Sequence, residues 1–258
     1  MEIKNIYTFI NNYSFSKIKN NFTTALFSCL VLLLLLSCNS NPPYIKGNGQ
    51  VVSEARNLNS FQELDIHGNY EVYLYRGAKE MVKVEADENI VDYIITEVKD
   101  GKLKVFDKES IKSKNNIKLY ITYNKLKRIN SGGAANIVSG NSLKSDHLQV
   151  KMSGAGLMDL KIEATTLDLN LSGAGLINLS GTVENQNLHI SGAGNLDAYR
   201  LKSKDCDINL SGIGGAQIFV EDNLNAHLSG VGGIRYKGNP LKVNREVAGL
   251  GRINQDKD

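Results

Sequence analysis

From residue 131 onward, apolar and polar positions follow a pattern that recurs roughly every 19 residues. Each copy carries a Ser-Gly-X-Gly motif or a close variant, with its first residue at 131, 153, 172, 191, 211, 229 and 248. Counted from this anchor, the first and third positions before it and the fifth and seventh after it are mostly apolar. All four offsets are odd, so one side of an extended chain is apolar on both sides of the glycines. The pattern predicts strand–turn–strand in every copy.

Strands that recur at this spacing without helical segments between them favour a parallel β-helix, in which each copy is one coil. A single coil cannot bury its apolar side, so the coils must fold together. We therefore expect an all-β, right-handed, single-stranded parallel β-helix of about 19-residue coils, with repeats from about 131 to 255.

Residues 56–130 predict a β-rich segment that precedes the repeats. Alternating apolar positions indicate strands at 64–66, 70–74, 81–84, 103–106 and 117–123. Between them, Ile90, Val91, Ile94, Ile95 and Val98 follow helical spacing. We expect one short helix over 87–98, with Asp87 as its N-cap.

The paired glycines of the repeat favour a structural role. Glycine is required where φ is positive or where a side chain would collide, and a corner recurring in every coil needs both. A nucleotide-binding loop is excluded because no helix pattern follows any copy and a third glycine at the Rossmann spacing is missing. The anchor serines either form a ladder of hydroxyl hydrogen bonds between coils or are simply small enough for a corner.

The polar side of the coils forms two outward columns. Six residues after the anchor stand Asp159, Asn178, Asp197, Gln217, Arg235 and Asn254. Two residues before it stand Lys151, Asn170, His189, Asn209 and His227. The first column is our candidate ligand face. A solvated sheet face would carry the same residue types.

The N-terminus predicts export and lipid attachment. Lys4, Lys17 and Lys19 precede an apolar run over 22–36, which is short for a membrane span and suits a signal peptide. The run ends at Ser37-Cys38, as in bacterial lipoprotein signals. We expect a signal peptide at 1–37, a lipid on Cys38, a polar tether at 38–55 and the folded domain at 56–258. An ordinary signal peptide or a membrane anchor is the alternative.

Composition excludes several classes of function. The 258-residue chain has a formal charge of +3 and no long basic run, so nothing points to nucleic acid. After cleavage before Cys38, Cys206 is the remaining free thiol; it falls on the inward side, and no disulfide forms within one chain. The four histidines lack metal-ligand spacing. We expect no metal, no cofactor and no catalytic residues.

One acidic pair keeps an enzymatic alternative open. Asp159 and Asp197 lie two coils apart, roughly 10 Å between backbones. This separation is near the wide end of the spacing of carboxylates in inverting glycosidases.

The chain resembles the auto-transporter adhesin family with a head GIN domain over about 61–254. The resemblance rests on Phe61-Gln62-Glu63-Leu64-Asp65-Ile66, Gly77, Val82-Lys83-Val84, Asp100-Gly101-Lys102-Leu103 and the serial Ser-Gly-Ala-Gly copies. Asn124-Lys125 stands where relatives commonly have a proline. The family implies an exported β-helix of the Gram-negative envelope, often a lipoprotein, and offers no catalytic residues to carry over.

These observations together predict a non-enzymatic, lipid-anchored envelope protein, placed at the outer membrane, that binds glycan or protein along a flat face. A polysaccharide lyase or glycoside hydrolase is one alternative. A structural or sensory envelope protein is the other.

Overall fold

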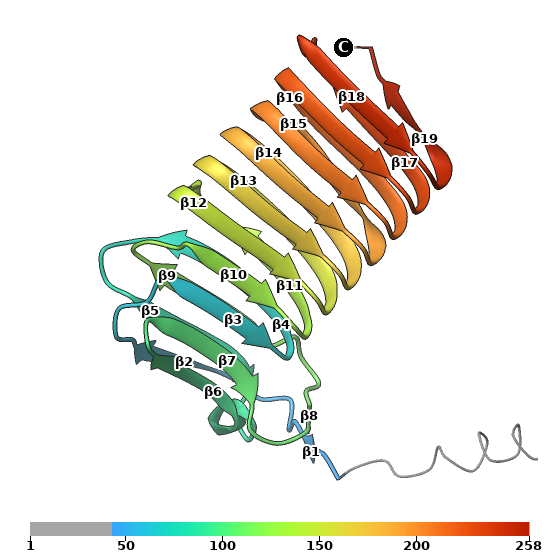
Figure 1. The fold of residues 1–258 in the computed structure, drawn as a ribbon. Coiled ribbons are helices and arrows are strands. Elements are labelled where there is room, and N and C mark those ends of the chain that lie inside the picture. The colour runs from blue at the N-terminus through green and yellow to red at the C-terminus, as the bar shows by residue number, and fades with distance from the viewer. Residues whose placement is uncertain (1–42, 258) are drawn as a thin grey trace, which may run out of the picture. The chain divides into compact units, whose positions relative to one another are not determined.

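The structure is a computed structural model that describes residues 43–257, and within them it is built almost entirely of strands (Figure 1). The N-terminal group comprises β1 (Ile45–Lys46), β2 (Val51–Asn57), β3 (Glu63–His67), β4 (Asn69–Arg76), β5 (Met81–Asp87), β6 (Ile94–Lys99), β7 (Lys102–Asp107), β8 (Ile111–Lys112) and β9 (Lys118–Tyr123). The repeats comprise β10 (Arg128–Ser131), β11 (Ala134–Ser139), β12 (Leu143–Met152), β13 (Ala155–Leu171), β14 (Ala174–Ile190), β15 (Ala193–Leu210), β16 (Ile213–Leu228), β17 (Val231–Lys237), β18 (Lys242–Val247) and β19 (Leu250–Gln255).

The coils stack through parallel pairing and form two faces. One face runs through β7, β3, β10, β12, the C-terminal parts of β13–β16, and β18; we call it the groove face. The opposite face runs through β9, β4, β11, the N-terminal parts of β13–β16, β17 and β19. The predicted parallel β-solenoid with coils of about 19 residues is confirmed.

The core lies between the two faces and includes the predicted inward columns. In the coil around Ser172, for example, Leu169, Leu171, Ile177 and Leu179 are at most 2% exposed. The same four positions are buried in the coils around Ser153, Ser191, Ser211 and Ser229, but not all four are buried in the last coil. The four odd offsets therefore identified the part of the core nearest the corners. The core also contains Leu143, Ile162 and Leu201, which lie ten residues before their anchors, an even offset that the pattern did not reveal.

Glycine is required at the corners because successive coils touch there through their backbones. A Cβ atom on Gly173 would lie 1.9 Å from the carbonyl oxygen of Gly154 in the preceding coil. At the second corner glycine, Gly214 adds a φ of 145° to a similar close approach to Gly194. The corner serines are linked through backbone N–H groups, as in Ser172 N to Met152 O at 3.0 Å. A ladder of serine hydroxyls is not formed among the described residues.

The register of the first copy differs from the sequence prediction by one residue. Ala134 pairs with Ala155, so Gly132 rather than Ser131 occupies the anchor position, and Ser131 is buried in an inward column. One coil earlier, Ile66-His67-Gly68-Asn69 pairs with Ser131-Gly132-Gly133-Ala134 and forms a copy that the sequence motif did not reveal.

The N-terminal coils are not stacked in the order of the sequence. The coil formed by β3 and β4 lies between the coil of β7 and β9 and the coil of β10 and β11. The chain thus runs away from this central coil, builds β5 to β9 on one side of it, and returns to build the repeats on the other side. Nothing in the periodicity signals this arrangement.

The N-terminal end of the core is closed by antiparallel strands and a turn. β5 pairs with β9 on the opposite face and β6 pairs with β7 on the groove face, so residues 88–93 cross between the faces. The predicted helix over 87–98 is wrong: only the 3-10 turn η1 (Val91–Tyr93) forms, and β6 follows it. Ile90, Val91 and Ile94 fit helical spacing because they cover the end of the core. The segment that follows the turn forms strand β6 because a strand can form backbone hydrogen bonds with the edge of β7, whereas a helix cannot.

Asp87 and Arg56 hold this end together. Asp87 is fully buried and accepts hydrogen bonds from Asn115 Nδ2 (2.7 Å), Lys114 N (3.1 Å) and Ser113 Oγ (3.2 Å). Arg56 NH2 donates to the carbonyl oxygen of Val91 at 3.0 Å, within the turn. Arg56 belongs to β2, whose first five residues were assigned to the tether and which pairs with β5.

The C-terminal end of the core is open. β18 and β19 form the last coil, and no strand of the described chain pairs with their outer edges. Val243 and Val247, which occupy inward columns, are 38% and 46% exposed. Residues 43–257 contain no helix long and apolar enough to cross a membrane.

Candidate functional site: a polar groove along one face

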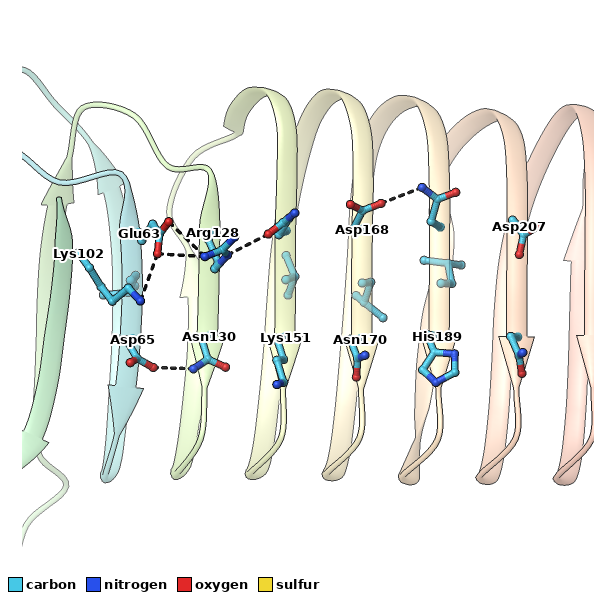
Figure 2. A pocket seen from close by; sticks show the side chains of 17 residues that line it. Glu63, Asp65, Lys102, Arg128, Asn130, Lys151, Asp168, Asn170, His189 and Asp207 are labelled. Atoms are coloured by element: carbon cyan, nitrogen blue, oxygen red, sulfur yellow. Dashed lines mark hydrogen bonds and ion pairs between the residues drawn. The ribbon is translucent and has the colours of Figure 1, made fainter. Parts of the chain in front are cut away.

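A hollow of about 740 Å³ runs across the strands of the groove face (Figure 2). Two rows of outward side chains line it, each row contributing one residue per coil. The first row contains Glu63, Arg128, Gln149, Asp168, Asn187 and Asp207. The second row contains Asp65, Asn130, Lys151, Asn170, His189 and Asn209. At about 4.8 Å per coil, the six coils span about 24 Å.

The first row is linked by hydrogen bonds and ion pairs at its N-terminal end. The Glu63 carboxylate forms ion pairs with Lys102 Nζ at 3.4 Å and with Arg128 Nη1 at 3.2 Å (Figure 2). Arg128 Nε donates a hydrogen bond to Gln149 Oε1 at 2.9 Å. Lys102 and Arg128 are 36% and 45% exposed, so these pairs fix side-chain positions more than they stabilise the fold.

Asp168 is held as a carboxylate in the middle of the first row. It accepts Asn187 Nδ2 at 2.7 Å and contacts His147 Nε2 at 2.5 Å. Partial burial alone would raise the pKa of Asp168, but the hydrogen bonds from Asn187 and His147 outweigh burial and lower it. An ionised Asp168 is a hydrogen-bond acceptor at neutral pH and is poorly suited to donate a proton.

The second row is less engaged than the first. Asn130 donates to Asp65 at 2.5 Å at one end. Farther along, the side chains of Lys151, Asn170 and His189 make no hydrogen bond or ion pair with another residue drawn in Figure 2. These groups are therefore available to a ligand that lies in the groove.

The predicted ligand face forms a column on the opposite face. Asp159, Asn178, Asp197, Gln217, Arg235 and Asn254 pair in sequence from coil to coil. A smaller hollow of about 410 Å³ includes Asn178, Asp197, Gln217 and Arg235 in its lining. The second predicted column, from Lys151 to Asn209, lies in the groove instead.

The first row of the groove was missed in the sequence. Asp168, Asn187 and Asp207 stand four residues before their anchors, an even offset that places them outward beside the second row. The signal was the recurrence of Asp, Asn and Gln at this offset. Glu63, Asp65 and Arg128 had no such signal, because they belong to coils whose repeat motif is degenerate.

The remaining chemically notable residues lie apart from the groove lining. Cys206 is buried as predicted, and burial raises the pKa of its thiol well above the ordinary value. Within residues 43–257, no group of three or more His, Cys, Asp or Glu side chains is arranged to hold a metal ion. Cys38 and the signal segment 1–37 lie outside the described residues.

The stacked coils and the long polar groove define a β-solenoid with an extended outer face. The chain belongs to the family described as "putative auto-transporter adhesin, head GIN domain", whose sequence profile matches residues 60–240. This result confirms the resemblance seen in the sequence. A comparison with curated proteins finds no match.

Solved structures from other bacteria share the fold. A putative adhesin from Bacteroides fragilis is 24% identical, with a TM-score of 0.79, covering 82% of this chain and 100% of its own. A putative lipid binding protein from Parabacteroides distasonis is 21% identical, with a TM-score of 0.67 and coverage of 83% and 100%. A putative adhesin from Parabacteroides merdae is 24% identical, with a TM-score of 0.62 and the same coverage. At these identities the likeness concerns the fold.

Proposed function

We propose that this chain is a non-enzymatic, adhesin-like protein of the cell envelope that binds a linear glycan along the groove face. One observation carries the proposal: unengaged polar groups recur at the coil spacing along a hollow that spans about 24 Å. Repeated weak contacts of this kind suit an extended polymer better than a compact ligand. The family description and the two similar structures described as putative adhesins agree with a binding role.

The chemistry of the groove favours binding over cleavage. Glycosidases need one carboxyl group with a raised pKa to protonate the leaving group. Asp168 has a lowered pKa, and Asp168 and Asp207 lie two coils apart, or about 9.6 Å between backbones. Hydrogen-bonded carboxylates and amides hold sugar hydroxyls without requiring proton transfer.

The column from Asp159 to Asn254 is the second candidate face. Its hollow is smaller, and Arg235 lies 3.8 Å from Asp256, so part of its charge is already paired. The two faces can be compared directly because both present one outward side chain per coil and column.

Retention on immobilised polysaccharides tests the proposal. The paired change Lys151→Ala and Asn170→Ala should weaken retention about tenfold, or about 1.4 kcal/mol, because it removes two unengaged groups. The control Asn178→Ala and Gln217→Ala, on the opposite face, should leave retention unchanged. The reverse result would place the ligand on the face predicted from the sequence.

Two further results would overturn the proposal. Failure of the wild-type protein to bind any envelope or host polysaccharide would leave a structural or sensory role. New reducing or unsaturated ends that disappear in Asp168→Asn, or in Asp159→Asn with Asp197→Asn, would establish an enzyme.

We also propose a lipid anchor on Cys38, at the outer membrane. The support is the apolar run over 22–36 followed by Ser37-Cys38. Mass spectrometry of the N-terminal peptide should show acyl groups on Cys38, and the wild-type protein should sediment with membranes. Cleavage of the wild-type chain at another residue, with release of soluble protein, would contradict the anchor.

A further inference from the structure

The second row of the groove alternates between two kinds of side chain. Over four successive coils, basic groups and amides follow one another: Lys151, Asn170, His189 and Asn209. The first row alternates in the same phase over these coils. Carboxylates Asp168 and Asp207 share coils with Asn170 and Asn209, while Gln149 and Asn187 share coils with Lys151 and His189. The chemistry of these four coils therefore repeats every two coils, whereas the two coils before them, which carry Glu63 with Asp65 and Arg128 with Asn130, do not follow the alternation.

The burial of the amides follows the same two-coil period. The Oδ1 atoms of Asn130, Asn170 and Asn209 are buried and lack a hydrogen-bond partner. The side chains of Asn170 and Asn209 line the groove beside the carboxylates of their own coils, and neither side chain forms a hydrogen bond within the described chain. A ligand that donates to such an amide oxygen would relieve the cost of leaving it unpaired.

A two-coil period is about 9.6 Å, which selects among extended polymers. An extended peptide advances about 3.3 Å per residue, so three residues span this distance. Successive side chains point to opposite sides of an extended peptide, so the third residue along presents its side chain away from the groove. In an extended 1,4-linked glycan, one sugar spans about one coil and a disaccharide spans two coils.

We infer that the groove is built for a 1,4-linked glycan with a disaccharide repeat, in which one sugar of each pair is acidic. This inference rests on the proposed function. The acidic sugar lies over the coils of Lys151 and His189, whose side chains meet its carboxylate. The neutral sugar lies over the coils of Asp168 and Asp207, whose carboxylates accept hydrogen bonds from its hydroxyl groups while Asn170 and Asn209 donate to its oxygens.

The carboxylates also supply discrimination. A polymer with an acid on every sugar would place negative groups over Asp168 and Asp207, and like charges in contact disfavour that complex. A neutral polymer would leave Lys151 without an anionic partner. Only alternation of acidic and neutral sugars satisfies both kinds of coil.

Three probes of equal length separate these cases. Heparosan oligosaccharides are 1,4-linked with an acid on alternate sugars, oligogalacturonate carries an acid on every sugar, and fully N-acetylated chito-oligosaccharides are neutral. Calorimetric titration of the folded domain should give heparosan at least about tenfold tighter binding than the other two. Equal binding of all three would overturn this inference and leave the proposed function standing. Binding of none, in a protein retained by no other glycan, would overturn both.

Charge removal provides the sharper test. Asp168→Asn with Asp207→Asn should raise the affinity for oligogalacturonate about tenfold and change the affinity for heparosan much less. The matched control is Asp159→Asn with Asp197→Asn, which removes two carboxylates at the same two-coil spacing from the opposite face. An equal gain in both double variants would show that net charge, and not alternation in the groove, sets the preference.

Discussion

The two ends of the coil stack are finished in different ways. At the N-terminal end, β5 and β6 add antiparallel strands to the two faces, η1 crosses between them, and Asp87 is buried among hydrogen-bond donors. At the C-terminal end, β18 and β19 simply stop, with Val243 and Val247 partly exposed. Coils of the same design therefore differ in stability according to their neighbours.

The difference shows what repetition supplies and what it does not. Within the stack, corner glycines and backbone hydrogen bonds recur, and each coil is completed by the next one. An end has no next coil, so its closure depends on particular side chains that occur once in the chain. Stability should fall toward the open end, where hydrogen exchange of backbone amides should be fastest.

The largest effect is expected from one glycine change made in the middle and at the open end. Gly192→Val should cost about 3 kcal/mol or more, because its Cβ would lie 1.9 Å from Gly173 O and both adjoining coils resist displacement. Gly249→Val meets Gly230 O at 2.1 Å, but the last coil can move away, so the cost should be less than half as large. Thermal denaturation followed by circular dichroism measures both. Equal losses would show that the last coil is as fixed as the middle.

A matched valine pair compares the ends themselves. Val105 and Val247 occupy the same inward column at opposite ends, with exposures of 0% and 46%. Val105→Ala should reduce the free energy of unfolding by about 2 to 3 kcal/mol, through lost burial and a cavity. Val247→Ala should cost under about 1 kcal/mol. Chemical denaturation gives both values, and similar losses would mean that the open end is covered in solution.

Removal of the buried carboxylate tests the closed end. Asp87→Ala should cost about 2 kcal/mol, because Asn115, Lys114 N–H and Ser113 lose their acceptor in a buried site. Asp92→Ala, in the exposed part of the same connection, should change stability by about half a kcal/mol or less. Loss of exchange protection should be confined to the closed end in the first variant. Equal free energies of unfolding for the two variants would show that Asp87 does not stabilise the N-terminal end of the core.

The contribution of Asp87 to the free energy of unfolding should depend on pH. Burial alone would raise the pKa of Asp87, but its hydrogen bonds from Asn115, Lys114 and Ser113 outweigh burial and lower it. A lowered pKa in the folded state stabilises the protein above the unfolded value, about 3.9, and this contribution is lost as the pH falls through the folded value. The stability gap between wild type and Asp87→Ala should stay constant above about pH 5 and narrow below about pH 4. A gap that widens in acid would reverse the sign of the shift.

The smallest change in stability is expected at the unpaired edge of β18. Exposed sheet edges invite pairing with another chain, and charged residues discourage it. Lys242→Thr with Arg245→Val should leave the melting temperature nearly unchanged and increase the average mass by light scattering as concentration rises. The control Lys46→Thr lies outside the main sheet. Unchanged mass at all concentrations would show that charge at this edge does not control association.

Sequence reasoning succeeded where structure is local and repeated. The inward columns followed from odd offsets, because each strand position has the same neighbours in every coil. It failed at Ser131, which lies in an inward column because the register of the first copy is shifted by one residue. It also failed at 87–98, where the apolar residues that cover the N-terminal end of the core happen to have helical spacing. Pattern alone cannot distinguish a helix face from a turn that covers a core.

Some residues of the candidate site could be predicted from the sequence and others could not. The column from Asp159 to Asn254 and the column of Lys151, Asn170 and His189 were both predicted to point outward, and they do. Their placement on opposite faces was not predicted. The larger hollow is lined in part by Glu63, Asp65 and Arg128, which come from coils without a clear motif. Their position follows from long-range pairing that the periodicity does not encode.

The interleaved coil of β3 and β4 has a consequence for the order of folding. In the repeats, a residue pairs with a residue of the next coil 17 to 21 positions later, whereas Glu63 pairs with Arg128, 65 residues later. Closing the longer loop costs about 1 kcal/mol more in chain entropy. During synthesis from the N-terminus, the backbone groups on one edge of β3 and β4 have no partner strand until β10 and β11 have been made. The coil of β3 and β4 is therefore among the first to be synthesised and among the last to be fully paired.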